Sequence, residues 1–262
     1  MTAPNDRPQR WNRLLELLSD TGRLSVEEAS ERLGVSAATV RRDFTALAEQ
    51  QLATRTHGGI VATSVAYDLP ARYRHGDEAK ARIAEHAAGL LPPTAVVGLN
   101  GGTTTSAVAR ALAGRSDLSA TEDDQLTIVT NALNIATEMV LRPHLRTICL
   151  GGIARRESYE LHGPLTERAL AELRLDAAVL GVNGISANGG AQCRHLDEAG
   201  VSAAMVRQSA EVIVVTPSDK LLRTALARIC AIEQVHVLVT DTDADAGVVA
   251  DIRAAGVRVD LV

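Results

Sequence analysis

The sequence has few cysteines, only two lysines and no long hydrophobic segment. Cys149, Cys193 and Cys230 follow neither the spacing of a zinc site nor that of a disulfide framework, so reduced thiols are expected. No segment reaches the roughly 18 uninterrupted apolar residues of a membrane helix, and the first residues lack the apolar core of a signal peptide. These absences predict a cytoplasmic protein without a membrane partner.

The motifs of several enzyme classes are also missing. The chain contains no Gly-x-Ser-x-Gly elbow, no Gly-x-x-x-x-Gly-Lys-[Ser/Thr] loop and no Gly-x-Gly-x-x-Gly after the first strand of its second half. The histidines other than His57 show no metal-binding spacing. Asp197 and Glu198 remain as candidate acid and base groups, but adjacency is no evidence of catalytic geometry. We therefore expect no metal, no cofactor and no catalytic residue.

The formal net charge of −5 disfavours a nucleic-acid partner, because phosphate neutralisation supplies most non-specific affinity for DNA. The charge is unevenly distributed, however: residues 1–60 hold eight arginines and eight acidic residues, so the negative excess belongs to the remainder. DNA affinity must then come from a local cluster, such as that of Arg41, Arg42, Arg55 and His57. With 262 residues and 46% hydrophobic content, the chain is long enough for one small and one medium domain.

The first sixty residues have the pattern of a helix-turn-helix. A wide apolar stripe predicts a first helix over residues 8–20. Residues 25–28 have the Ser-x-x-Glu form of a capping box, which starts a second helix ending near Leu33. Gly34 then supplies the tight turn to a third helix.

The third helix is expected to begin at Ser36, which is a good N-cap. At 100° per residue its core face is distinct from its exposed face. The core face consists of Val40, Phe44 and Leu47. The opposite face consists of Ala38, Arg42 and Thr45, with Arg41 at its flank. Residues 52–61 predict two short strands around a glycine turn, which would form a wing.

A winged helix-turn-helix over residues 8–61 would place its third helix in the major groove of DNA. Arg42 and Thr39 are expected to read base edges, while Arg41, Arg55 and Ser36 hold phosphates. His57 either contacts DNA or only polarises the wing turn. In the alternative interpretation, the arginines are solvated residues of a protein-interaction module. The predicted DNA-binding residues are Ser36, Ala38, Thr39, Arg41, Arg42, Arg55 and His57.

The remainder of the chain predicts a second domain of α/β class. Residues 62–78 lack strong periodicity and are expected to form a linker. Residues 79–262 then alternate helical segments with short continuous apolar runs, which is typical of a mainly parallel sheet covered on both faces. The predicted strands are residues 95–99, 126–130, 146–150, 176–180, 212–216, 235–240 and 257–261.

Glycine and hydroxyl residues gather where the first predicted strand ends. Gly101, Gly102 and the amides of residues 103–105 would lie at the N-terminus of a helix. Free amides and the helix dipole favour an anion there, and a phosphate would fit. The same residues can equally form a tight turn with a capped helix.

Polar residues also follow the next four predicted strands, and turns alone would not require so many of them. Ligands of open α/β sheets bind beyond the carboxyl ends of the strands, so these residues are candidates for a ligand site. Lys220 would neutralise a phosphate or be a solvated surface residue. Asp197 and Glu198 would accept hydrogen bonds from sugar hydroxyls or be first-turn acids of a helix starting near Leu196. The predicted ligand-binding residues are Gly101, Gly102, Thr103, Thr104, Asn131, Gly151, Gly152, Gly181, Asp197, Glu198 and Lys220.

The order and spacing of these motifs closely resemble the DeoR family of bacterial transcriptional regulators, from about Arg10 to Thr240. The resemblance rests on Val35-Ser-Ala-Ala-Thr-Val-Arg-Arg-Asp43, Arg55-Thr-His-Gly-Gly59, Gly102-Thr-Thr104, Thr130-Asn131, Leu150-Gly-Gly152, Leu175-Asp-Ala-Ala-Val-Leu-Gly181, Asp197-Glu198 and Ser218-Asp-Lys220. It implies a winged helix-turn-helix followed by a sensor domain related in fold to ribose-5-phosphate isomerase and glucosamine-6-phosphate deaminase.

The resemblance also implies a function. Members mostly repress sugar, polyol or nucleoside catabolic operons and are released from DNA by a phosphorylated intermediate, so operator DNA, a sugar phosphate and further copies of the chain are the expected partners. The alternative is an isomerase or deaminase that carries a DNA-binding domain. Two departures stand out. Asn100 and Gly101 replace the acidic residue and serine that commonly precede Gly-Thr-Thr, and residues 216–220 read Thr-Pro-Ser-Asp-Lys where Ala-Asp-Ser-Ser-Lys is typical. The first departure is expected to alter contacts to ligand hydroxyls.

Overall fold

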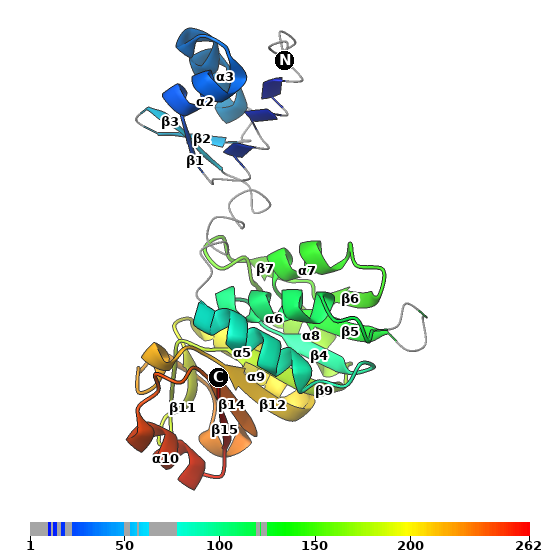
Figure 1. Cartoon of the computed structure of the whole chain (residues 1–262). Helices are drawn as coiled ribbons and strands as arrows, with labels where there is room; N and C mark the ends of the chain where they lie inside the picture. The colour runs from blue at the N-terminus through cyan, green and yellow to red at the C-terminus, as the bar shows by residue number, and fades with distance from the viewer. Residues whose placement is uncertain are drawn as a thin grey trace. The chain divides into compact units, whose positions relative to one another are not determined.

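The computed structural model describes residues 10, 11, 13, 14, 17, 18, 23–49, 53–56, 58–62, 78–118, 121 and 125–262. The chain divides into two compact units, Met1–His75 and Gly76–Val262 (Figure 1). Most of the expected linker, residues 63–77, lies outside the described residues. In the described part of the chain, no helix is long and apolar enough to cross a membrane.

In the N-terminal unit, helix α2 (Val26–Leu33) has the ends that the sequence predicts. The Ser25 side chain accepts a hydrogen bond of 3.1 Å from the Glu28 amide at the start of the helix. Gly34 ends the helix with a φ of 65°, in the left-handed region that favours glycine. The turn between the second and third helices is therefore confirmed.

Helix α3 (Ala37–Glu49) follows this turn, and its first amides are capped by Ser36, which accepts a hydrogen bond of 3.2 Å from the Thr39 amide. Residues 10, 11, 13, 14, 17 and 18 of the predicted first helix are helical, and the rest of that prediction lies outside the described residues. The buried residues of these two helices, among those described, are Arg10, Leu14, Leu17, Leu18, Val40, Asp43, Phe44 and Leu47.

The wing consists of strands β2 (Ala53–Thr56) and β3 (Gly59–Ala62), as predicted. A third strand, β1 (Arg23–Ser25), pairs with β3 in the antiparallel order β1-β3-β2. Three residues are too few to show an alternating pattern, so β1 is not predicted by the sequence. This pairing places Ser25 opposite Gly59, where a Cβ would collide with the Leu24 carbonyl oxygen.

The C-terminal unit is built on a seven-stranded sheet whose neighbours all pair in parallel, in the order β15-β14-β12-β9-β4-β5-β6. The strands are β4 (Val96–Leu99), β5 (Leu126–Thr130), β6 (Leu145–Cys149), β9 (Leu175–Gly181), β12 (Ser209–Val215), β14 (Val237–Thr240) and β15 (Arg258–Leu261). Each lies within a few residues of an apolar run that predicts it, which confirms the α/β class.

Helices cover both faces of this sheet (Figure 1). On one face lie α5 (Glu78–Gly89), α6 (Thr103–Ala113) and α7 (Leu133–Met139), whose apolar side chains share a core with alternate residues of the central strands. The other face is covered by α8 (Pro164–Ala171), α9 (Leu196–Gln208) and α10 (Ala246–Ala254), which form a second core. The strands are thus buried on both sides, which explains their continuous apolar runs.

The strand order reverses between β4 and β9. From β4 the chain runs outward through β5 to β6, returns to β9, and then runs outward in the other direction through β12 and β14 to β15. Loops at such a switch point diverge to opposite faces and leave room for a ligand beyond the carboxyl ends of the strands. The predicted ligand loops lie at this edge.

Several short elements have no counterpart in the sequence analysis. Strands β7 (Ile153–Ala154) and β8 (Leu161–His162) form a small hairpin. A second antiparallel sheet contains β10 (Gly184–Ser186), β11 (Gly190–Cys193) and β13 (Ala227–Cys230). Two short 3₁₀ helices are η2 (Ser218–Lys220) and η3 (Ile232–Gln234). Strands of two to four residues carry too little periodicity to be predicted from apolar pattern.

Candidate functional site

The exposed face of α3 carries the basic side chains of the N-terminal unit. Arg41 and Arg42 are both exposed, whereas Val40 and Phe44 are fully buried. Ser36 and Ala38 are exposed near the start of the same helix, and Thr39 is half-buried with its hydroxyl 2.9 Å from that of Ser36. The amphipathic pattern predicted for the third helix is therefore confirmed.

The wing is connected to α3 through a chain of hydrogen bonds. Arg55 of β2 donates from Nη1 to Thr45 Oγ1 at 2.6 Å, and the Thr45 hydroxyl donates to the Arg41 carbonyl at 2.9 Å. A shallow hollow at this place is lined by Arg41, Arg42, Thr45, Ala46, Glu49 and Arg55. Three guanidinium groups against one carboxylate make the hollow basic, so it suits a phosphate. His57 lies outside the described residues.

Asp43 was not singled out by the sequence analysis, although it lies beside the two arginines. It is buried on the core side of α3, where Arg10 binds it through Nε and Nη2. Trp11 donates a further hydrogen bond of 3.0 Å from Nε1. This buried ion pair connects the first helical segment to α3 and so holds the exposed arginines in place.

In the C-terminal unit, the loop after β4 leads into α6 without a capping side chain. Gly102 has a φ of 131°, which favours glycine, and the helix begins at Thr103. Both residues are exposed, so the first amides of α6 are accessible to an anion. The Thr104 and Thr105 side chains are buried, and the Thr105 hydroxyl donates to the Gly102 carbonyl at 3.2 Å.

Asn100 connects the two strands at the switch point. Its Oδ1 accepts a hydrogen bond of 2.9 Å from the Gly181 amide, and its Nδ2 donates to the Gly181 carbonyl at 2.9 Å and to Ser202 Oγ at 3.2 Å. A carboxylate in this position would have no proton for the Gly181 carbonyl, whereas an amide serves both groups. Asn100 therefore holds β4 against β9 rather than facing a ligand.

Glu160 lies in the middle of the predicted ligand residues, although the sequence analysis did not identify it. Its side chain is buried, accepts a hydrogen bond of 3.1 Å from Asn131 Nδ2 and is hydrogen bonded to the Gly101 amide. A Cβ on Gly101 would lie only 2.6 Å from Glu160 Oε1, so this glycine is required by close approach. Burial and the neighbouring charge of Glu198 raise the pKa of Glu160 to about 7.

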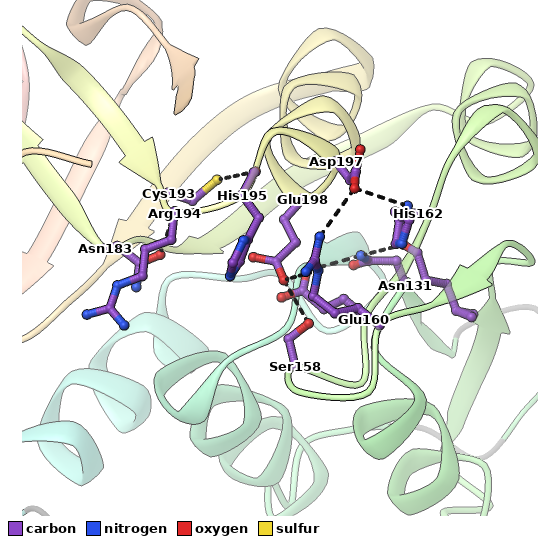
Figure 2. Close-up of polar contacts among 12 residues, drawn as sticks. Asn131, Ser158, Glu160, His162, Asn183, Cys193, Arg194, His195, Asp197 and Glu198 are labelled. Carbon is purple, nitrogen blue, oxygen red and sulfur yellow. Dashed lines mark hydrogen bonds and ion pairs between the residues drawn. The ribbon is translucent and has the colours of Figure 1, made fainter. Parts of the chain in front are cut away.

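The first turn of α9 brings the buried Glu198 to the same place, while the neighbouring Asp197 is exposed and contacts Arg155 and His162. Figure 2 shows the side chains of Asn131, Ser158, Glu160 and Glu198 pointing toward one another. The Ser158 hydroxyl donates to Glu198 Oε1 at 2.7 Å. Arg155 lies 3.3 Å from the same oxygen through Nε and 3.2 Å from Asp197 Oδ2 through Nη2. We call Asn131, Glu160, Asp197 and Glu198 the acidic cluster.

The other predicted ligand residues have mainly structural contacts. The Gly151 carbonyl accepts a hydrogen bond of 2.6 Å from Thr166 Oγ1. Gly152 has a φ of 154°, and a Cβ there would collide with Thr166 and with the backbone of His162. Lys220 donates to the Val182 carbonyl at 3.0 Å, and burial lowers its pKa. Lys220 is thus half-buried rather than a solvated surface residue.

The structure brings Gly101, Asn131 and Glu198 together around Glu160 and places the uncapped start of α6 one residue away. Only the order of these segments along the chain was visible in the sequence. Glu160 follows Tyr159, whose left-handed φ of 61° turns the loop sharply. No residue pattern in the sequence predicts that turn. Among the described residues, no group of three His, Cys, Asp or Glu side chains is arranged to hold a metal ion.

A winged helix-turn-helix with exposed arginines, joined to a parallel α/β domain with an accessible ligand edge, defines a transcriptional regulator with a sensor domain. Residues 10–65 match the model of the DeoR-like helix-turn-helix domain, and residues 76–242 match that of the DeoR C terminal sensor domain. The chain belongs to the DeoR family. It is a DNA-binding transcriptional regulator and not an enzyme.

The relatives agree with this assignment. The glycerol-3-phosphate regulon repressor of Escherichia coli strain K12 is 34% identical over 89% of this chain and 90% of its own. The HTH-type transcriptional regulator GlpR of Haloferax volcanii is 33% identical over 96% of each chain. A solved structure of D-ribose-5-phosphate isomerase in complex with phospho-erythronic acid is similar over 56% of this chain and 54% of its own, with 17% identity and a TM-score of 0.41.

Proposed function

We propose that the protein represses a carbohydrate or polyol catabolic operon and that a phosphorylated sugar-type effector relieves its binding to DNA. The observation that carries this proposal is the accessible, uncapped start of α6 beside the acidic cluster, which offers one place for a phosphate and another for polar groups. Relatives named as repressors support repression of the operon rather than its activation. Such a protein would act in the cytoplasm, where its operator lies.

On the DNA side, two or more subunits would place their α3 helices in successive major grooves. Arg42 and Thr39 would read base edges, with Ala38 close to the bases. Arg41, Arg55 and Ser36 would hold phosphates, and His57 would contribute from the wing. The link from Arg55 through Thr45 to the Arg41 backbone supports a shared phosphate position for helix and wing.

On the sensor side, the effector phosphate would bind the Gly102 backbone, the amides of Thr103 and Thr104 and the Thr103 hydroxyl, next to Gly101, whose amide is hydrogen bonded to Glu160. The remainder of the molecule would contact Asn131, Asp197 and Glu198. Gly151, Gly152 and Gly181 would shape the surrounding backbone, and Lys220 would stabilise the anion at longer range. The ligand can release DNA only as far as it binds the released state more tightly than the DNA-bound state.

The test is a selection of DNA fragments that bind the purified full chain, repeated in the presence of a panel of sugar phosphates. We expect one inverted or repeated sequence to be enriched, and one class of sugar phosphate to abolish its enrichment. A variant with Arg41→Ala and Arg42→Ala serves as the control and should enrich no sequence. Enrichment that no phosphorylated sugar or polyol changes, together with no thermal stabilisation by any of them, would refute the effector class.

A further inference from the structure

The acidic cluster holds two buried carboxyl groups, those of Glu160 and Glu198, beside one guanidinium. Arg155 lies 3.3 Å from Glu198 and 3.2 Å from the exposed Asp197, which also lies 3.8 Å from His162 Nδ1. Glu160 is hydrogen bonded to the uncharged groups of Asn131 and Gly101. Its pKa is raised to about 7, so a cation bound beside it would favour its ionised form.

The cluster also contains hydrogen-bond acceptors that the described residues leave open. Asn131 is fully buried, and its Oδ1 has no hydrogen-bond partner among the described residues. Its Nδ2 donates both to Glu160 and, at 3.0 Å, to the Leu161 carbonyl, which fixes the orientation of the amide. Glu198 uses Oε1 for Ser158, and no contact to its Oε2 is found in the described part of the chain. Arg155 Nε is also buried without a hydrogen-bond partner in the part of the chain that the structure describes, although it lies 3.3 Å from Glu198 Oε1. A partner that satisfies Asn131 Oδ1 must supply a hydrogen-bond donor.

We propose that the effector carries a protonated amino group, which binds Glu160, Glu198 and the Asn131 carbonyl while its phosphate binds the start of α6. This inference rests on the proposed function. An ammonium group offers three donors and one positive charge, which match the acceptors of Glu160, Glu198 and Asn131 and compensate the second of the two carboxyl groups. A hydroxyl group offers a single donor and no charge. The geometry thus assigns the effector to the amino sugar phosphates or amino polyol phosphates.

The two binding places are close enough for one small molecule. The Gly101 amide is hydrogen bonded to Glu160, and the next residue, Gly102, is the N-cap of α6. The amino group and the phosphate would therefore bind to neighbouring parts of the same loop. Gly101 is what permits this arrangement, because any Cβ would push the Glu160 carboxyl group away.

The experiment compares matched ligands that differ by one group. Binding of D-glucosamine 6-phosphate and D-glucose 6-phosphate, and of the corresponding galactose pair, is measured by calorimetry on the full chain, its Glu160→Gln variant and a control. The control is Glu172→Gln, since Glu172 is exposed and lies between the end of α8 and the start of β9, at the opposite edge of the sheet. Circular dichroism and melting temperature verify that each variant is folded.

For the unmodified chain and for Glu172→Gln, we expect at least one amino compound to bind about 10-fold or more tightly than its hydroxyl counterpart. In Glu160→Gln this preference should fall to about twofold or less, while the hydroxyl compound binds as before or better. Equal or tighter binding of the hydroxyl compounds to the unmodified chain overturns the inference and leaves the proposed function standing. The same conclusion follows if Glu160→Gln prefers the amino compound as strongly as the unmodified chain does. If no member of either pair binds but a sugar phosphate without an amino group does, the inference falls alone. Absence of binding by every phosphate compound overturns both.

Discussion

Single residues decide where ligands can bind in this protein, and the sequence pattern revealed only some of these residues. Gly34 and Ser36 could be predicted because turns and N-caps use a small set of residue types. Glu160 could not, because its role comes from Gly101, Asn131 and Glu198, which approach it only in the folded chain. Asn100 was expected to change ligand contacts, yet its amide joins β4 to β9.

Arg42 and Arg41 should affect DNA binding differently. Arg42→Ala should cost roughly 1–3 kcal/mol in operator binding and relax base preference at one position, because it removes a contact to a base edge. Arg41→Ala should weaken binding to all sequences alike and reduce the salt slope by about one, because it removes a phosphate contact. Titrations at several salt concentrations measure both. Equal and sequence-independent losses would contradict the assignment, and the exposed Arg174 provides a control substitution.

Gly101 and Glu160 should be coupled energetically. Gly101→Ala is expected to destabilise the C-terminal unit by about 1–3 kcal/mol, because the added Cβ overlaps the Glu160 side chain. In a Glu160→Ala background most of this cost should vanish, as a double-mutant cycle by chemical denaturation would reveal. Gly102→Ala is the contrasting substitution, since its cost comes from a φ of 131° and should be the same in both backgrounds. Additive effects of the first pair would show that the close approach is unimportant.

Elements were predicted best where burial is complete. The strands of the large sheet are covered on both faces, so each appears in the sequence as a continuous apolar run. The short strands β1, β7, β8, β10, β11 and β13 carry no such run and were missed. The order of the large sheet could not be predicted either, because apolar runs identify strands without saying which are neighbours.

The position of α3 should depend on Asp43. Asp43→Ala leaves the Arg10 guanidinium buried without its main partner, so a loss of roughly 3–5 kcal/mol in the stability of the N-terminal unit is expected. Trp11 is the only tryptophan in the chain and touches Asp43, so its fluorescence during urea unfolding reports on this unit. Glu31→Ala, an exposed change on α2, should have little effect. Unfolding midpoints that are the same for both variants would argue against a structural role of the ion pair.

At the scale of the whole molecule, the negative net charge and the arginine-rich surface belong to different parts of the chain. The first sixty residues balance their charges, and the excess carboxylates lie beyond them, some of them crowded into the acidic cluster. Stability should therefore depend on pH through the C-terminal unit.

Glu160 should make the protein less stable as pH rises. Its pKa is raised from 4.5 to about 7 by burial and by Glu198, with Arg155 acting in the opposite direction, so the folded chain holds a proton that the unfolded chain releases between these values. The free energy of unfolding then decreases from about pH 4.5 to about pH 7. Glu160→Gln should remove this decrease and raise the melting temperature by a few degrees at pH 8 but little at pH 5, because about 1 kcal/mol corresponds to roughly 2–4 °C for a domain of this size. Parallel pH profiles for the variant and the unmodified chain would contradict the prediction.

The long connection between the two central strands has a consequence for synthesis of the protein. Asn100 and Gly181 are 81 residues apart, so the ribosome must make most of the C-terminal unit before β4 can pair with β9. The N-terminal unit is complete long before then and folds first, as N-terminal domains generally do during translation. A newborn chain therefore acquires its DNA-reading helix before it has any means of sensing a metabolite, and a ribosome stalled in the second half would carry an unregulated DNA-binding unit.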